Sequence, residues 1–225
     1  MIVHGSGETQ IHFPMTIDYF LDSFNLKDPY EILNVFEQKL ADFFGSKYAV
    51  LTDCCTHAIE LSLRLTPPEL IIIPKHTYVS IPMTAIKLHC NFKFADVEWS
   101  NYYNLGNNIY DAAVLWKKDS YISGSKMCVS FQHKKHINIG RGGCILLDDL
   151  EEYKLLKKMR HDGRDPTIKH QTDNISVVGY HYYLTPELAL KGIELFDLKK
   201  DLPPRIWTNN DYTDLTQLDV FKSYV

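Results

Sequence analysis

The sequence has little of several features that would narrow its function at once. Its five cysteines form no CxxC pair, and no His-x-x-x-His spacing accompanies them, so no metal site is predicted. An odd number of cysteines without paired spacing favours a reducing, cytoplasmic setting. The apolar runs are too short to span a bilayer. Residues 1–14 lack the apolar segment of a signal peptide.

The chain also lacks an excess of positive charge. It carries 24 basic and 28 acidic residues, a formal net charge of -4, and no long basic stretch. This balance gives no support to nucleic-acid binding, which depends on clustered Lys and Arg side chains. Internal repeats and low-complexity linkers are missing too. What remains is the composition of an ordinary globular protein, 45% hydrophobic and 23% charged, with one or two domains.

Helical and strand-like patterns alternate along the chain. Helical spacing of apolar residues begins near Asp28, a predicted N-cap, followed by Pro29, and ends at Gly45. Further helices are predicted at 54–65, 79–89 and 150–163, and strands at 47–52, 70–73, 91–98, 107–113, 126–131 and 142–149. This alternation predicts an α/β protein with a mostly parallel sheet flanked by helices. Ligands would then bind where the strands end, and 128–131 should pair with 143–147 as a hairpin.

Two residues near strand ends are candidates for ligand contact. Thr56 begins a helix directly after a strand, where backbone N–H groups and its hydroxyl could bind an anion. The alternative is a helix-capping threonine without a ligand. Tyr78 follows the next strand and could stack on a flat ligand. The alternative is an ordinary aromatic at the edge of the core.

Two further positions carry chemistry that is costly to bury. Asp111 ends an apolar strand, where a carboxylate needs a partner such as a protonated pyridine nitrogen. Capping of a following helix is the alternative. Ser130 ends another strand, and Lys134 and Lys135 follow it. A lysine in a partly desolvated site has a lowered pKa and can attack carbonyl groups. The alternative is a pair of solvated surface charges.

In this order, these pieces resemble the DegT/DnrJ/EryC1/StrS aminotransferases, which act on sugar nucleotides with pyridoxal phosphate (PLP). The resemblance runs from about Phe36 to about Leu195. Its anchors are "FEQKLADFFGSKYAVLTDCCTHAIELSL", "IIIPKHTYVS", "FADVEWSNYYNL", "IYDAA", "SFQHKKHINIGRGG" and "GYHYYLTPELA". It implies the type I (aspartate-aminotransferase-like) PLP-transferase fold and transfer of an amino group from glutamate to a nucleotide-linked keto sugar.

The resemblance also implies cofactor-binding roles. The phosphate-binding turn falls on Cys55 and Thr56, the stacking aromatic on Tyr78, the partner of the pyridine nitrogen on Asp111, and a phosphate contact on Ser130. The family's Schiff-base lysine stands five residues after that serine, which selects Lys135 as the catalytic residue. His181 stands where the family has an asparagine that reaches the neighbouring subunit's phosphate.

Several residues depart from the family pattern. Val114 replaces a glutamine that contacts the cofactor's phenolic oxygen, and Cys55 replaces a glycine. Arg141 stands where the residue in the Gly-x-Gly-Gly turn is usually acidic, and His181 replaces the asparagine. A strand–helix unit that the family carries before "IYDAA" is missing, because Asn104 precedes Asp111 by only seven residues.

The resemblance therefore predicts a reduced large domain at 1–200 and a C-terminal tail at 201–225, with the small domain largely absent. Missing sheet edges would need cover, which favours a homodimer. Two alternatives stay open beside the aminotransferase. One is a catalytically impaired relative that binds a nucleotide sugar or a protein partner in a regulatory role. The other is the family's dehydratase branch, in which histidine replaces the lysine, with His133 and His136 nearby.

Overall fold

The computed structural model describes residues 15–224; the predicted absence of a signal peptide concerns residues 1–14, which lie outside this range. The elements are α1 (Ile17–Phe24), α2 (Glu31–Phe44), β1 (Tyr48–Thr52), α3 (Cys55–Leu65), β2 (Ile71–Pro74), α4 (Ser80–Lys87), β3 (Phe92–Ala95), β4 (Tyr103–Gly106), β5 (Ile109–Asp111), β6 (Lys126–Ser130), β7 (Gly143–Leu147), α5 (Leu150–Arg160) and α6 (Pro186–Lys199). Within residues 15–224, no helix is long and apolar enough to cross a membrane.

The central sheet has five strands in the order β1-β7-β6-β5-β4, and β2 and β3 form a separate parallel pair. The predicted α/β class is confirmed, and so is the β6–β7 pairing, in which Cys128 faces Ile145. The expectation of a mostly parallel sheet is wrong, since only β5 and β6 run parallel among the four pairings of the central sheet. The β4–β5 connection, residues 107 and 108, forces antiparallel pairing, because a parallel crossover needs a dozen or more residues.

A tight hairpin joins β4 to β5, where the family carries its extra strand–helix unit. Gly106, Asn107 and Asn108 all have positive φ angles, of 108°, 47° and 56°. Glycine and asparagine tolerate this left-handed region better than other residues. The chain therefore reverses within the turn, and β4 lies beside β2.

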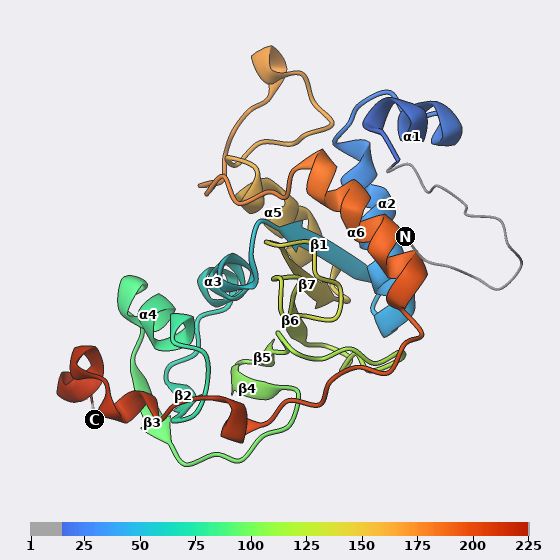
Figure 1. Cartoon of the computed structure of the whole chain (residues 1–225). Coiled ribbons are helices and arrows are strands. Elements are labelled where there is room, and N and C mark those ends of the chain that lie inside the picture. The colour runs from blue at the N-terminus through green and yellow to red at the C-terminus, as the bar shows by residue number, and fades with distance from the viewer. Residues whose placement is uncertain (1–14, 225) are drawn as a thin grey trace, which may run out of the picture.

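Figure 1 shows α2 and α6 on one side of the central sheet and α3 on the other, and a hydrophobic core lies on each side. Successive strand residues alternate between them, as strand geometry requires. Val129 and Leu146 pack into the core that contains residues of α2 and α6. Cys128 and Ile145 pack into the core that contains residues of α3 and α5. The sheet is thus buried on both sides, so its strand ends are the places where polar groups can reach solvent.

Helix α2 begins two residues later than the sequence predicted. Its N-cap is Tyr30, and the carboxylate of Asp28 instead accepts a hydrogen bond from the Tyr30 backbone, at 2.7 Å. Asp28 therefore stabilises a turn ahead of the helix. The predicted stop at Gly45 is confirmed, because this glycine caps the helix with φ 83°.

The chain after α6 runs back across the molecule to the small sheet, as the red ribbon of Figure 1 shows. The Asn101 backbone N–H donates to the Trp207 carbonyl at 3.0 Å, and the Leu215 N–H donates to the Lys75 carbonyl at 2.8 Å. Phe221 is fully buried and lies edge-on to Phe94 of β3. We call residues 203–224 the C-terminal strap.

Candidate active site

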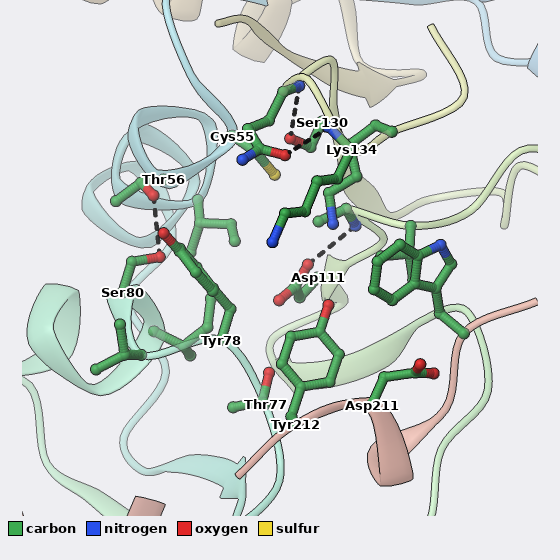
Figure 2. A pocket seen from close by; sticks show the side chains of 18 of the residues that line it. Cys55, Thr56, Thr77, Tyr78, Ser80, Asp111, Ser130, Lys134, Asp211 and Tyr212 are labelled. Atoms are coloured by element: carbon green, nitrogen blue, oxygen red, sulfur yellow. Dashed lines mark hydrogen bonds between the residues drawn. The ribbon is translucent and has the colours of Figure 1, made fainter. Parts of the chain in front are cut away.

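A cavity of about 860 Å³ lies where β5 and β6 end and α3 begins. Its lining comes from α3, the segment after β2, the ends of β5 and β6, the loop before β7, and the C-terminal strap. Figure 2 shows Thr56, Tyr78 and Ser80 on one side of this cavity and Asp111 and Tyr212 on the other. Of the predicted site residues, it brings together Cys55, Thr56, Tyr78, Asp111, Ser130 and Lys135.

Asp111 is a buried carboxylate at the end of β5, only 6% exposed. One of its oxygens accepts the hydroxyl of Tyr103 at 2.6 Å, and the other accepts the Ala113 N–H at 3.0 Å. Burial raises the pKa of Asp111, and these hydrogen bonds offset burial only in part. The site therefore favours a positively charged group beside this carboxylate.

The loop between β6 and β7 presents two lysines to the cavity. Lys134 is exposed, whereas Lys135 is half-buried and its Nζ lies 4.7 Å from the centre of the Trp207 ring. Burial lowers the pKa of Lys135, the charge of Asp111 opposes this, and Lys134 and Arg205 lower it further. Lys135 is therefore the lysine whose surroundings favour the neutral, nucleophilic amine.

The N-terminus of α3 forms the opposite corner of the cavity. The hydroxyl of Thr56 donates to Ser80 Oγ at 2.9 Å, and the first-turn N–H groups lack partners within the helix. Gly143 of β7 fixes this corner, because a Cβ there would lie 2.4 Å from the Cys55 nitrogen. The close backbone approach explains why a glycine begins β7.

Cys55, which departs from the family's glycine, turns its side chain into the protein. Its thiol donates to the Cys128 carbonyl at 3.4 Å and is 8% exposed. Burial raises the pKa of this thiol well above its usual value, so it stays neutral. The corner thus keeps its backbone N–H groups despite the added side chain.

Other predicted positions lie differently. Tyr78 lines the cavity with 58% of its surface exposed, and Val114 lines it where the family has glutamine. His181 lies in a different groove, beside Asp162 at 2.8 Å. His136 Nε2 donates a hydrogen bond to the Lys199 carbonyl at 2.7 Å, and the His136 ring stacks on Trp116.

Comparison with known proteins decides the family. The sequence model of the DegT/DnrJ/EryC1/StrS aminotransferase family matches residues 15–115 and 120–198. The chain belongs to this family. No curated protein matched the sequence.

Several solved structures share the fold. AtS13 from Actinomadura melliaura has TM-score 0.68 at 17% identity, covering 86% of this chain and 68% of its own. A Bacillus cereus protein described as a PLP-dependent aminotransferase has TM-score 0.64 at 15% identity, covering 80% and 62%. Helicobacter pylori PseC, an aminotransferase of pseudoaminic acid biosynthesis, has TM-score 0.62 at 16% identity, covering 74% and 57%. The chain thus spans less than two thirds of the latter two structures.

The site residues predicted from the sequence do not include one wall of the cavity. Residues that lie after the part of the chain matched by the family model form this wall. Arg205, Trp207, Asp211 and Tyr212 of the C-terminal strap line the cavity. The Arg205 guanidinium lies 3.9 Å from the centre of the Trp207 ring and pairs with Asp211. A polar, aromatic segment without helical or strand periodicity was the available signal, since such residues often form ligand-binding surfaces.

Proposed function

We propose that this chain is a PLP-dependent aminotransferase that moves an amino group from glutamate to a nucleotide-linked keto sugar. The observation that carries the proposal is the convergence of Lys135, Asp111 and the α3 N-terminus on one cavity. Family membership supports the reaction class, and the H. pylori neighbour is itself an aminotransferase of sugar biosynthesis.

The residues of the cavity fit pyridoxal phosphate. The buried Asp111 carboxylate, whose pKa is raised by burial, suits a protonated ring nitrogen. The N–H groups of the α3 first turn, with Thr56 and Ser130, suit the phosphate. Tyr78 would stack on the ring, and Lys135 would hold the cofactor covalently. When bound, the cofactor withdraws electrons from the substrate carbon that exchanges its proton.

The chain's own residues supply the proton chemistry. Lys135 Nζ, with its pKa lowered by burial, can accept a proton from a substrate carbon and return it to a neighbouring atom. Hydrogen bonds from the Tyr103 hydroxyl and the Ala113 N–H fix the position of the Asp111 carboxylate. Val114 offers no hydrogen bond where the family has glutamine. Electrostatic stabilisation of the bound cofactor would therefore depend more on Asp111 and Lys135.

Cationic side chains at the cavity support an anionic substrate. Lys134, Arg141 and Arg205 line the cavity together with Lys135. The carboxylates of Asp111 and Asp211 line the same cavity and offset part of this positive charge. Both glutamate and a nucleotide-linked sugar are anions, and guanidinium groups bind carboxylates and phosphates through paired hydrogen bonds.

The proposal includes a cytoplasmic homodimer with the reduced large domain at 1–200 and the tail at 201–225. His181 is exposed in the groove beside Asp162 and has a left-handed φ of 54°. A side chain held outside its own chain's cavity would be available to contact a partner subunit's cofactor phosphate. Sedimentation of wild type and His181→Ala, each with and without PLP, would test this arrangement.

A second candidate is a catalytically impaired relative that binds a nucleotide sugar or a protein partner. Two observations favour it: Val114 lines the cavity, and the Trp207 ring stands 4.7 Å from Lys135 Nζ. This candidate predicts cofactor or sugar-nucleotide binding without amino-group transfer to any keto sugar, so a turnover assay with glutamate separates the two.

The test of the proposal is a visible absorption spectrum of the purified protein with added PLP. Wild type and Lys134→Ala should show a band of lysine-bound cofactor that Lys135→Ala lacks. Borohydride reduction followed by peptide mapping should place the modified amine at Lys135. No band in wild type would sink the proposal. A band that only Lys134→Ala abolishes would move the reactive amine by one residue.

A further inference from the structure

Four side chains cluster at the rim of the cavity, and three of them, Asp53, Cys54 and His57, have no role in the proposed reaction. Cys54 is the N-cap of α3, Asp53 precedes it, and His57 lies in the first helical turn. The Cys54 sulfur, an Asp53 oxygen and a His57 ring nitrogen lie within 4.8 Å of one another. Arg141, from the loop before β7, reaches the same cluster.

The cluster carries more positive than negative charge around the Cys54 sulfur. The Asp53 carboxylate pairs with both His57 Nδ1, at 2.6 Å, and the Arg141 guanidinium, at 2.7 Å. Burial disfavours the protonated imidazole, but bonds to Asp53 and Cys54 raise the pKa of His57 to about 9. At neutral pH two cations therefore share one carboxylate, and the α3 N-terminus adds partial positive charge.

This environment differs from that of the other cysteines. Cys55, Cys128 and Cys144 are buried, and burial raises the pKa of each thiol. Burial also raises the pKa of the half-buried Cys90. Cys54 is half-buried, lines the cavity, and has two cations beside it. Cationic neighbours and a helix N-terminus are the conditions that favour a thiolate.

We infer that Cys54 is a reactive thiol and a site of oxidation by hydrogen peroxide. The Cys54 sulfur attacks one peroxide oxygen; the S–O bond forms as the O–O bond breaks. Sulfur gives up two electrons, and the peroxide is reduced. His57 passes its ring proton to the departing hydroxide, which leaves as water, and takes the proton of the thiol in its place, so the products are a sulfenic acid and water. Arg141 and Asp53 are positioning residues.

Oxidation would alter the corner of the cavity next to the sulfur. Cys54 directly precedes Cys55 and Thr56, whose N–H groups lie at the α3 N-terminus. An added oxygen would compete for these donors with any anion. This consequence for PLP uptake rests on the proposed function, whereas the reactivity of Cys54 does not.

The first experiment measures thiol reactivity in the full chain at neutral pH. Iodoacetamide labelling, followed by peptide mapping, should modify Cys54 faster than Cys90 by about tenfold or more. His57→Gln and Arg141→Gln should each slow Cys54 labelling several-fold and leave Cys90 unchanged. The exposed Arg141 gives a variant with little risk to folding. Equal rates at Cys54 and Cys90, or no effect of either variant, would overturn the inference.

The second experiment tests the oxidation itself. Hydrogen peroxide with dimedone should label Cys54 in wild type, and Cys54→Ser should remove that label. Fast alkylation without any dimedone adduct would overturn the oxidation step. If a peroxide-treated protein carries the adduct yet binds PLP normally, the thiol is reactive but does not control the cavity. If untreated protein fails to bind PLP, the proposed function fails instead.

Discussion

Two walls of the cavity differ in how much of the hydrophobic core supports them. Asp111 and Ser130 end strands of the central sheet and are 6% and 8% exposed. In the wall formed by the C-terminal strap, Arg205 is exposed and Trp207 is half-buried. The strap is anchored to the small sheet by a few backbone bonds and by buried Leu215 and Phe221. Groups that must keep a fixed geometry stand on the wall that the core supports.

This difference assigns separate tasks to the two walls. The sheet wall carries the carboxylate and the serine that face the proposed cofactor. The wall formed by the strap adds an arginine, an aromatic ring and a carboxylate that lie outside the family match. We therefore expect substitutions in the sheet wall to impair chemistry, and those in the strap to impair binding.

The largest effect is expected from Asp111→Asn. The amide keeps the shape of the side chain but removes the charge that would face the protonated ring nitrogen, so turnover should fall about 10²- to 10³-fold. Asp211→Asn on the opposite wall is the matched control, and should lose less than about tenfold. Steady-state rates of both variants would measure the contrast. Equal losses would remove the distinction between the walls.

The next effect concerns how the strap is anchored. Phe221→Ala removes a fully buried ring, which costs about 3–5 kcal/mol of packing. Because the strap contacts the rest through few elements, this loss should free residues 203–224 for limited proteolysis while the main unfolding transition stays in place. Val220→Ala, at a side chain 51% exposed, is the control. If the variant instead shows a single unfolding transition whose free energy falls by the full packing loss of about 3–5 kcal/mol, then the strap and the sheet unfold together.

A smaller effect is expected from pH, at the rim between the walls. The pKa of His57 rises from 6.5 to about 9 in the folded chain. The pairing of His57 with Asp53 therefore stabilises the fold fully at pH values below 6.5, the pKa in the unfolded chain. This stabilisation is lost as pH rises through about 9, the pKa in the folded chain. The loss should be of the order of 1–3 kcal/mol. Urea unfolding of wild type and His57→Gln across this range would measure it; parallel curves would contradict the assignment.

The smallest effect is expected from Trp207→Ala. This change removes the ring beside Lys135 and Arg205, and each cation–π contact contributes about 0.5–1 kcal/mol at an exposed site. The affinity for PLP, measured by calorimetry, should fall by a few-fold. Ile206→Ala, at a neighbouring side chain 70% exposed, should bind as wild type does. A much larger loss would place Trp207 with the residues of the sheet wall.

Much of the fold and of the sheet wall could be predicted from the sequence. Helix α3, β6 and β7 have local signals, namely helical or strand-like apolar patterns and, for β7, a glycine-rich turn at its start. The order of Thr56, Tyr78, Asp111, Ser130 and Lys135 along the chain supplied the resemblance to the family. These features depend on residues close in sequence, which patterns capture directly.

The direction of β4 and the start of α2 could not be predicted in the same way. Both depend on short connections: the turn at Asn107 and Asn108, and the Asp28 carboxylate bonded to the Tyr30 N–H. A strand's pattern of apolar residues is the same in either direction. Only the length and conformation of the turn decide whether its neighbour runs parallel or antiparallel.

The sequence by itself determined the α/β class, the order of the elements from α2 to α5 apart from β4, and which residue types stand at the strand ends. Tertiary structure alone decided that Tyr103 would support Asp111, that Arg141 would join Asp53 and His57, and that Trp207 would stand over Lys135. These contacts join residues 8, 88 and 72 positions apart. Local propensity carries no information about such pairings, because they form only when packing of the core brings distant segments together.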